Sequence, residues 1–242
     1  MKTILITGAS SGIGAACAER FLETGWIVGL LARSAEKLDK IARGRDRAIP
    51  LVCDVTDAEA TDRTIRRFAK AAGKLDVVFN NAGQFGPAGE IDAIDLAELD
   101  ATIDVNLKGM IHTARSAWSV MKAQTPQGGR IINNGSISAH VPRAHALAYT
   151  VTKHAITGLT RQLALDGRAV NIACGQIDIG NARTDLLDGI IARAEAEGAP
   201  APATMDVADA VRGVETMAQM PLSANVLYMT VMATQMPYVG RG

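Results

Sequence analysis

The stretch Thr3-Ile4-Leu5-Ile6-Thr7-Gly8-Ala9-Ser10-Ser11-Gly12-Ile13-Gly14 indicates the fold of this chain. Its first five residues are apolar or β-branched and predict a short strand. Glycines in the turn that follows permit tight turning and the close approach of a ligand, and the free N–H groups at a helix start attract phosphate. The spacing, Gly-x-x-x-Gly-x-Gly, departs from the standard dinucleotide fingerprint, and three glycines can also form a simple turn. Because the turn follows the first strand, we favour a pyrophosphate site, with the candidate contacts Gly8, Ser10, Ser11, Gly12, Ile13 and Gly14.

Short β-rich runs alternate with longer helical patterns along the rest of the chain. Strands are predicted at 3–7, 26–32, 48–53, 75–79, 130–134, 169–174 and 225–231. Helical patterns occupy 13–24, 34–43, 57–72, 95–123, 147–165 and 206–219. Apolar strands separated by helices are typical of a parallel sheet covered on both faces. We therefore predict that 1–242 forms one α/β domain, a Rossmann-type doubly wound parallel sheet of about seven strands.

Composition and charge disfavour several classes of partner. Lys plus Arg and Asp plus Glu both number 25, so the formal net charge of the 242 residues is zero. A neutral chain without a basic block gives no electrostatic reason to expect nucleic acid or a membrane surface. No apolar run suits a signal peptide or a membrane span. The three cysteines lack metal-ligand spacing, so we expect buried thiols, no metal site and a cytoplasmic location.

The end of the second predicted strand bears on the choice of dinucleotide. In this fold an acidic residue about 20 positions after the glycines binds the adenosine ribose of NAD, whereas arginine suits the 2′-phosphate of NADP. Here the strand ends in Arg33-Ser34, and no acid occurs before Glu36. Arginine and serine can both donate to phosphate, so the sequence favours NADP(H) over NAD(H). The alternative is a solvated arginine at a helix start.

Two further motifs follow the third and fourth predicted strands. Asp54-Val55 offers a carboxylate to the adenine amine, or Asp54 simply caps the next helix. Asn81-Ala82-Gly83, preceded by Asn80, lines the cofactor or builds a turn. Ligands in open α/β sheets bind beyond the carboxyl ends of the strands, which is where these motifs and the glycine turn all lie.

The chemistry is predicted around Tyr149 and Lys153, which are four residues apart in a helical pattern. That spacing places two side chains on one helix face, and an adjacent ammonium favours the phenolate. A tyrosine with a lowered pKa can donate or accept a proton. Ser136 follows the fifth predicted strand and can bind the same substrate oxygen. Asn106 lies in the long helix, where a buried amide needs a partner and can be purely structural.

In combination these motifs resemble the short-chain dehydrogenase/reductase family, and the match covers nearly the whole chain. The resemblance implies a catalytic tetrad of Asn106, Ser136, Tyr149 and Lys153. By this resemblance, Tyr149 would exchange a proton with the substrate oxygen, which Ser136 would orient. Lys153 would lower the pKa of the tyrosine and hold the nicotinamide ribose, and Asn106 would support a water that relays protons to Lys153. The nicotinamide would exchange hydride with the substrate carbon.

One segment departs from the family pattern, which has Pro-Gly, then Val or Ile, then Thr, after strand six. In this chain Cys174 replaces the proline and Ile179 the threonine, while Gly175 and Ile177 fit and are expected to contact the nicotinamide. Asn181 or Thr184 is a candidate to replace the missing hydroxyl. We expect 178–205 to cover the substrate, with Arg183 as either an anion contact or a surface residue. His140 and His145, between Ser136 and Tyr149, either line the pocket or lie on a surface loop.

The sequence therefore predicts an NADP(H)-dependent oxidoreductase that interconverts a secondary alcohol and a ketone or related carbonyl. Its partners are a small-molecule carbonyl or alcohol and, as in relatives, further copies of the chain in a dimer or tetramer. One alternative is an NAD-linked dehydrogenase of a sugar or dihydrodiol. Another is a catalytically silent dinucleotide sensor, against which the complete tetrad argues.

Overall fold

A seven-stranded parallel sheet forms the centre of the molecule in the computed structural model, which describes residues 1–184, 187, 191 and 201–239. The strands are β1 (Thr3–Thr7), β2 (Ile27–Ala32), β3 (Ala48–Val52), β4 (Val77–Asn80), β5 (Gly129–Asn134), β6 (Ile172–Ile179) and β7 (Tyr228–Val231). Their order is β3-β2-β1-β4-β5-β6-β7, and every neighbouring pair is parallel. The chain reverses its winding between β1 and β4, where such sheets form a crevice for ligands. The predicted Rossmann-type doubly wound fold is confirmed.

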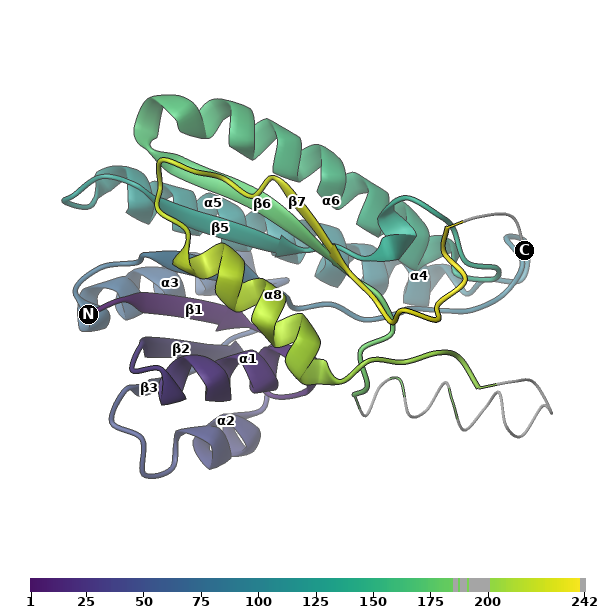
Figure 1. Ribbon diagram of the computed structural model, residues 1–242, viewed down its shortest axis with the longest axis horizontal. Helices are drawn as coiled ribbons and strands as arrows, with labels where there is room; N and C mark the ends of the chain where they lie inside the picture. The colour runs from purple at the N-terminus through teal and green to yellow at the C-terminus, as the bar shows by residue number, and fades with distance from the viewer. Residues whose placement is uncertain (185–186, 188–190, 192–200, 240–242) are drawn as a thin grey trace.

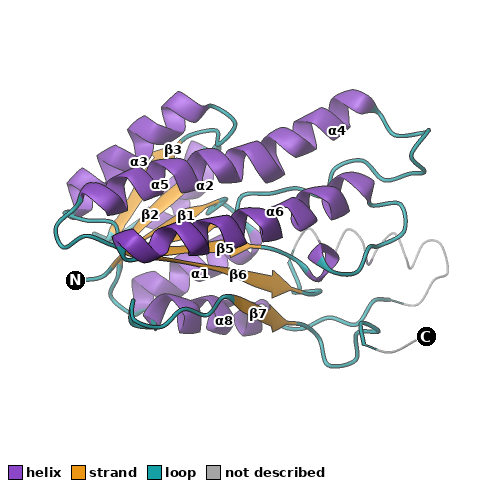
Figure 2. Cartoon of the chain, turned by 90° about the horizontal axis from the view of Figure 1, so that it is seen from above, coloured by secondary structure: helices purple, strands orange, loops and turns teal. Residues whose placement is uncertain are grey.

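Helices cover both faces of this sheet (Figure 1). They are α1 (Gly12–Glu23), α2 (Ala35–Ala42), α3 (Ala58–Ala72), α4 (Leu96–Ile103), α5 (Met110–Ala123), α6 (Leu147–Asp166) and α8 (Val207–Gln219), with shorter turns η1 (Asp104–Gly109), η2 (Ile137–Ala139) and η3 (Gly167–Val170). Residues of α1 and α8 pack in one core cluster against the sheet, and residues of α3, α5 and α6 pack in the other. Figure 2 shows α3, α5 and α6 running side by side.

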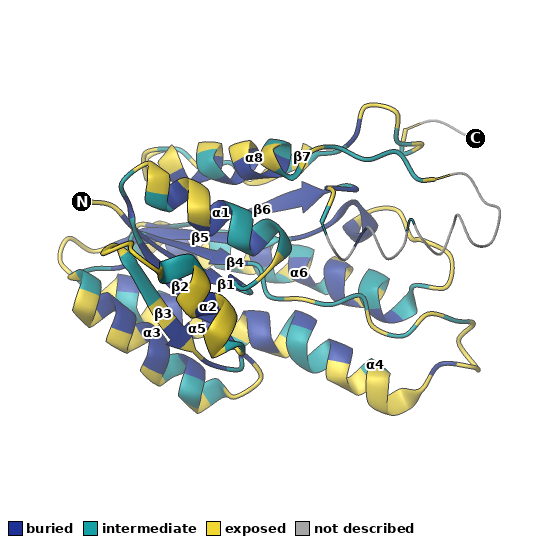
Figure 3. Cartoon of the chain, turned by 90° about the horizontal axis from the view of Figure 1, so that it is seen from below, coloured by how far each residue is buried: buried dark blue, intermediate teal, exposed yellow. Residues whose placement is uncertain are grey.

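The central strands are buried because both of their faces are covered, whereas the edge strands β3 and β7 have exposed residues. Every residue of β1 is buried, as are nearly all residues of β2 and β6. In Figure 3 the central strands are dark blue, while the helices are blue toward the sheet and yellow toward solvent. Burial of apolar surface stabilises the fold by roughly 25 cal/mol per Å². The two core clusters therefore hold the strand ends, and the turns beyond them, in one rigid frame.

The sixth strand was predicted at 169–174, and this is wrong. Residues 167–170 form the 3-10 turn η3, and β6 continues to Ile179. The continuation was missed because Gln176 and Asp178 are polar. Both side chains are fully buried; Gln176 donates to Asp178, and further partners come from Ser136 and from Thr160 on α6, so the strand continues without unpaired polar groups.

The long helix predicted at 95–123 is present, but it is interrupted by a π-helical segment. Between α4 and α5 the chain forms the π-helical turn η1, which contains Asn106. Gly109 allows close packing at the end of this turn, because a Cβ there would lie 2.7 Å from a methyl carbon of Val55. Single π turns within helices are frequent at functional sites.

Candidate active site

A cavity of about 650 Å³ lies beyond the carboxyl ends of the strands. It is formed by the turns after β1 to β6 and the start of α6, so residues far apart in sequence meet there. Most of the predicted site residues line it: Gly8, Ser10, Ser11, Gly12, Ile13, Arg33, Ser34, Asp54, Val55, Asn81, Ala82, Gly83, Ser136, Tyr149 and Lys153. The structure thus brings most of the predicted nucleotide contacts and three members of the predicted tetrad into one cavity.

The glycine turn presents the start of α1 to this cavity. Gly8 and Gly12 have φ values of 67° and 52°, in the left-handed region that favours glycine. The side chain of Ser11 does not cap α1, whereas Ser34 and Asp57 cap α2 and α3. The first N–H groups of α1 are therefore available to an anion, and the helix dipole favours negative charge there.

Two asparagines connect the ends of three central strands. Asn81 donates through Nδ2 to the carbonyl oxygen of Thr7, 2.9 Å away, and Thr7 Oγ1 accepts from the backbone N–H of Asn81 at 2.8 Å. Asn134 Nδ2 donates to Asn81 Oδ1 at 2.8 Å. The carbonyl oxygen of Asn134 in turn accepts from Lys153 Nζ at 2.7 Å. This chain of bonds fixes Lys153 relative to the glycine turn.

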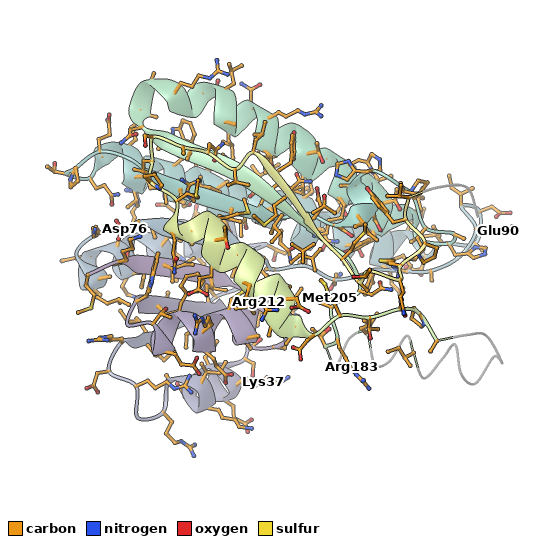
Figure 4. All side chains as sticks on the ribbon, viewed as in Figure 1. Lys37, Asp76, Glu90, Arg183, Met205 and Arg212 are labelled. Atoms are coloured by element: carbon orange, nitrogen blue, oxygen red, sulfur yellow. The ribbon has the colours of Figure 1, made fainter. Side chains whose placement is uncertain are left out.

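Positive charge gathers where β2 ends. Arg33 and Ser34 line the cavity as predicted, and Lys37 from the first turn of α2 joins them. Lys37 is labelled in Figure 4. The same figure labels Arg183 and Met205, which mark the place where the chain after β6 lies beside the segment that leads into α8. Ser34 Oγ also accepts from the backbone N–H of Lys37, so this serine caps α2 as well as lining the cavity.

Asp54 lines the cavity beyond β3. Its Oδ1 accepts from the backbone N–H of Thr56 at 3.0 Å and from Thr56 Oγ1 at 2.9 Å. The alternative that Asp54 caps the following helix is wrong, because Asp57 accepts from the N–H of Ala60 and caps α3. Asp54 therefore keeps its second carboxylate oxygen for a ligand at this end of the cavity.

Ser136, Tyr149 and Lys153 meet at the other end of the cavity. Burial raises the pKa of Tyr149, while a hydrogen bond with the Ser136 side chain and the charge of Arg143 lower it. Lys153 Nζ lies 5.4 Å from the centre of the Tyr149 ring. Burial lowers the pKa of Lys153 itself to about 8, against an opposing effect of Asp178. The expected lowering of the Tyr149 pKa by Lys153 is therefore replaced here by a net rise that burial causes.

The Asp178 carboxylate at the end of β6 binds the backbone of Ser136. Its side chain is fully buried, and Oδ1 accepts from the backbone N–H of Ser136 at 2.9 Å and from Gln176 Nε2 at 2.7 Å. Oδ2 lies 2.8 Å from His140 Nε2. His140 thus meets a carboxylate and is not among the residues that line the cavity, and neither is His145. The carboxylate holds the turn that presents the Ser136 hydroxyl.

Asn106 lies behind the cavity wall rather than in it. Its side chain is fully buried, with Nδ2 donating to the carbonyl oxygen of Gln84 at 2.7 Å and Oδ1 accepting from the N–H of Gln84 at 2.8 Å. Nδ2 also lies 3.3 Å from Thr152 Oγ1 on α6. Since Gln84 lines the cavity, Asn106 fixes the loop after β4 against the helix that carries Tyr149 and Lys153.

Three other predicted contacts do not line the cavity: Gly14, Gly175 and Ile177. A Cβ on Gly14 would clash with the carbonyl oxygen of Gly8, so this glycine serves the packing of α1 on the turn. Gly175 and Ile177 lie inside β6, because the strand is longer than predicted. The chain reaches the cavity later, and Asn181 and Thr184, named as replacements for the missing hydroxyl, do line it.

Sequence reasoning missed several residues of the site. Lys37, Gln84, Phe85, Asn134 and Arg143 all line the cavity, and Phe85 packs on the Tyr149 ring with the ring centres 4.7 Å apart. Their position in the sequence could have identified them, because each lies within a few residues of a motif already recognised. The predicted covering segment 178–205 falls partly outside the described residues, which omit 185–186, 188–190 and 192–200.

A family model described as short chain dehydrogenase matches residues 2–195. The chain belongs to the short-chain dehydrogenase family. An uncharacterized oxidoreductase of Staphylococcus aureus (strain USA300) is 37% identical over 184 residues, which cover 73% of this chain and 78% of that protein. A short chain dehydrogenase from Burkholderia cenocepacia J2315, solved in complex with NADP, is 32% identical with a TM-score of 0.82, covering 96% of both chains.

A second solved neighbour shares the fold at lower identity. It is a 3-ketoacyl-(acyl-carrier-protein) reductase from Brucella melitensis, complexed with NADH, with a TM-score of 0.85 and 22% identity over 97% of this chain and 98% of that one. The chain is thus an oxidoreductase of the short-chain dehydrogenase family, in which solved neighbours bind NADP or NADH. None of the described helices has the length and hydropathy that a bilayer-spanning segment needs.

The residues present fit a nicotinamide dinucleotide. The uncapped start of α1 and the Gly8 and Gly12 turn suit a pyrophosphate, and a Cβ on Gly8 would lie 3.0 Å from the backbone of Ala82 and narrow the cradle. Within the described ranges no three His, Cys, Asp or Glu side chains form a candidate metal site. All three cysteines are free and buried, and burial raises the pKa of the Cys174 thiol to about 12.

Proposed function

We propose that this protein is an NADP(H)-dependent oxidoreductase that interconverts a ketone or related carbonyl and the corresponding alcohol. The observation that carries the proposal is the convergence of Ser136, Tyr149 and Lys153 at one end of a cavity whose other end holds Arg33 and Ser34. A bound nicotinamide supplies hydride chemistry, and the remaining steps belong to side chains of this chain.

The proton chemistry follows from the hydrogen bonds at the reaction end. Ser136 Oγ accepts from the backbone N–H of Ser138 at 3.1 Å, which orients the hydroxyl, and its O–H, here paired with the Tyr149 phenol, can turn to donate to a substrate oxygen. The Tyr149 phenol donates to the same oxygen, and its raised pKa keeps it protonated and able to act as the acid in carbonyl reduction. Lys153, held by the carbonyl oxygen of Asn134, places its ammonium beside the tyrosine and stabilises the phenolate that proton transfer leaves.

The preference for NADP(H) is supported by the side chains at the end of β2. Arg33, Ser34 and Lys37 line the cavity together, and two cations with a hydroxyl suit a 2′-phosphate. Burkholderia cenocepacia short chain dehydrogenase, at 32% identity, was solved with NADP. The runner-up is an NAD-linked dehydrogenase; Asp54 lines the same end and can accept from the adenine amine that both cofactors share, so this contact does not distinguish them.

Steady-state kinetics with NADPH and NADH, over a panel of ketones, aldehydes, oxo acids and sugars, test this proposal. We expect turnover with NADPH that Tyr149→Phe abolishes. Tyr228→Phe is the matched control, because Tyr228 lies on β7 outside the cavity lining and its hydroxyl accepts from Arg161. Full activity of Tyr149→Phe contradicts the mechanism.

Arg33→Ala tests the cofactor preference separately. A charge-assisted contact to phosphate is worth about 1.5–3 kcal/mol, so we expect the KM for NADPH to rise about 10- to 100-fold and the KM for NADH to stay the same. Arg43→Ala, an exposed arginine at the other end of α2, is the control. An NADPH KM that is unchanged in Arg33→Ala excludes the phosphate role.

We also propose that the chain forms a homo-oligomer through α5 and α6. Large apolar side chains are exposed on both helices: Ile111 on α5, and Val151 and Leu165 on α6. Packing of these helices against a second copy of the chain would remove this apolar surface from water. Light scattering after size exclusion tests this, with Val151→Asp expected to lower the assembly mass. A wild-type mass of one chain contradicts it.

A further inference from the structure

The charged residues that line the cavity fall into two groups. Arg33, Lys37 and Asp54 follow β2 and β3, at the end assigned above to the adenosine half of the cofactor. The other two, Arg143 and Lys153, follow β5 and lie at the reaction end. Lys153 Nζ is bound to the carbonyl oxygen of Asn134 and serves the tyrosine, but no step of the proposed reaction uses Arg143. A cation that faces a reaction cavity without a role in proton transfer is a candidate for binding the substrate.

Arg143 is held at the cavity wall by the segment that follows β6. One of its terminal N–H groups donates to Asn181 Oδ1 at 3.2 Å. Asn181 is itself anchored, because its Nδ2 donates to the carbonyl oxygen of Ala203 at 3.0 Å and its carbonyl oxygen accepts from the N–H of Met205 at 2.9 Å. Both Arg143 and Asn181 line the cavity. The guanidinium is thus positioned before any substrate arrives.

Arg143 has no carboxylate partner among the residues that the structure describes. Arg143 is exposed to solvent. Its bond to Asn181 uses only one of the several N–H donors of the guanidinium group. The charge also reaches the reaction centre, since Arg143 lowers the pKa of the Tyr149 phenol. Donors that remain free on a fixed cation near the reacting groups match an anionic part of a ligand.

The neighbouring surfaces narrow the type of anion. A single guanidinium neutralises one negative charge and pairs with the two oxygens of a carboxylate in a planar fork, whereas a phosphate dianion calls for more cations. The Phe85 ring, packed on Tyr149 and lining the cavity, offers an apolar wall for the carbon chain beside the carbonyl. Carbonyl, short carbon chain and carboxylate thus each have a counterpart in the wall.

We propose that Arg143 binds a carboxylate of the substrate, so that the enzyme interconverts an oxo acid and a hydroxy acid. This inference rests on the proposed function, and it adds a substrate class to the same site. The carbonyl oxygen lies at Ser136 and Tyr149, and the carboxylate lies at Arg143. Ester or amide analogues of the same carbon skeleton lack the charge and lose this contact.

Kinetics with matched acids and esters test the inference. We would measure kcat/KM with NADPH for acetoacetate and 2-oxobutyrate and for their methyl esters, using wild type, Arg143→Gln and Arg63→Gln. Arg63 is an exposed arginine on α3, paired with Glu59 far along the chain from the site, and serves as the control. The loss of a charge-assisted contact lowers kcat/KM for the preferred acid about 10- to 100-fold in Arg143→Gln and leaves the esters unchanged. Arg63→Gln changes neither.

A binding titration separates this inference from the proposed function. Either acid, titrated into the protein with NADP⁺, forms a complex that cannot react, and its Kd should be weaker in Arg143→Gln by a similar factor. The inference is overturned if the wild type has equal kcat/KM for acid and ester, or if Arg143→Gln leaves the Kd of the acid unchanged. In either case, turnover of a ketone still supports the proposed function. If no carbonyl of either kind is turned over, the proposed function fails, and the titration still decides whether Arg143 binds a carboxylate.

Discussion

Removal of the Asp178 carboxylate should destabilise the protein, whereas its conversion to an amide should not. Oδ1 accepts from the backbone N–H of Ser136 and from Gln176 Nε2, and Oδ2 meets His140 Nε2. In Asp178→Ala the Ser136 N–H becomes a buried donor without a partner, which costs about 1–3 kcal/mol. Gln176 Nε2 keeps a bond to Thr157 Oγ1 at 3.1 Å, so its loss is smaller.

The net change in the free energy of unfolding is about 2–4 kcal/mol for Asp178→Ala, since relief from burying a charge offsets part of the lost bonds. For a chain of this size that corresponds to a fall in Tm of about 5–15 °C. Asp178→Asn retains an acceptor for the Ser136 N–H and can donate its amide to His140, so we expect a loss of about 1 kcal/mol or less. Asp39→Ala, an exposed aspartate on α2, is the control.

Activity provides a second measurement on Asp178→Asn. Asp178 raises the pKa of both Tyr149 and Lys153, so its neutralisation lowers both values. The alkaline limb of the pH–rate profile should therefore move to lower pH whichever of the two groups sets it. Thermal unfolding of Asp178→Ala at the wild-type Tm, or an alkaline limb that stays in place in Asp178→Asn, would refute this reasoning.

Three further outcomes are expected. The pKa of Lys153 is lowered from 10.5 to about 8, so the unfolded state binds more protons than the folded state between these pH values. The Tm of the wild type should therefore increase relative to the Tm of Lys153→Met as the pH rises from 8 to 10.5. A Tm difference that stays constant over this range would contradict this expectation. Arg130→Ala should lower stability by about 3–5 kcal/mol, measured by urea unfolding, because four neutral acceptors within 220–225 lose their buried guanidinium donor; an unchanged urea midpoint would count against this. Gly14→Ala should weaken NADPH binding in a fluorescence titration, since a Cβ there clashes with the Gly8 carbonyl, and tight binding would disprove that packing role.

The fold and half of the site follow from local sequence patterns. Strand and helix alternation predicted the doubly wound sheet, because apolar runs of strand length can only be buried between helices. The glycine turn and the Tyr149-x-x-x-Lys153 spacing were equally local, since a turn and a helix face are set by residues close in the chain. The resemblance to the short-chain dehydrogenase family, carried by these motifs, is confirmed at the family level.

Other features depended on contacts that no local pattern encodes. The polar end of β6 was mistaken for a loop, because the partners of Gln176 and Asp178 come from α6 and from the turn after β5. The π turn at Asn106 is held by Gln84, 22 residues earlier in the chain. Neither partnership could be inferred from the residues around these positions, since many polar side chains in similar contexts lie on a surface.

The sequence by itself determined the order of strands and helices, the glycine turn after β1 and the Tyr149-x-x-x-Lys153 spacing, because each rests on residues close together in the chain. Only the tertiary structure decided the electrostatic state of Tyr149 and Lys153 and which other residues line the cavity beside them. Burial, rather than Lys153, dominates the pKa of Tyr149, and Arg143 reaches the cavity through its bond to Asn181. Desolvation and long-range hydrogen bonds arise only when distant elements pack together, and so they are absent from the sequence pattern.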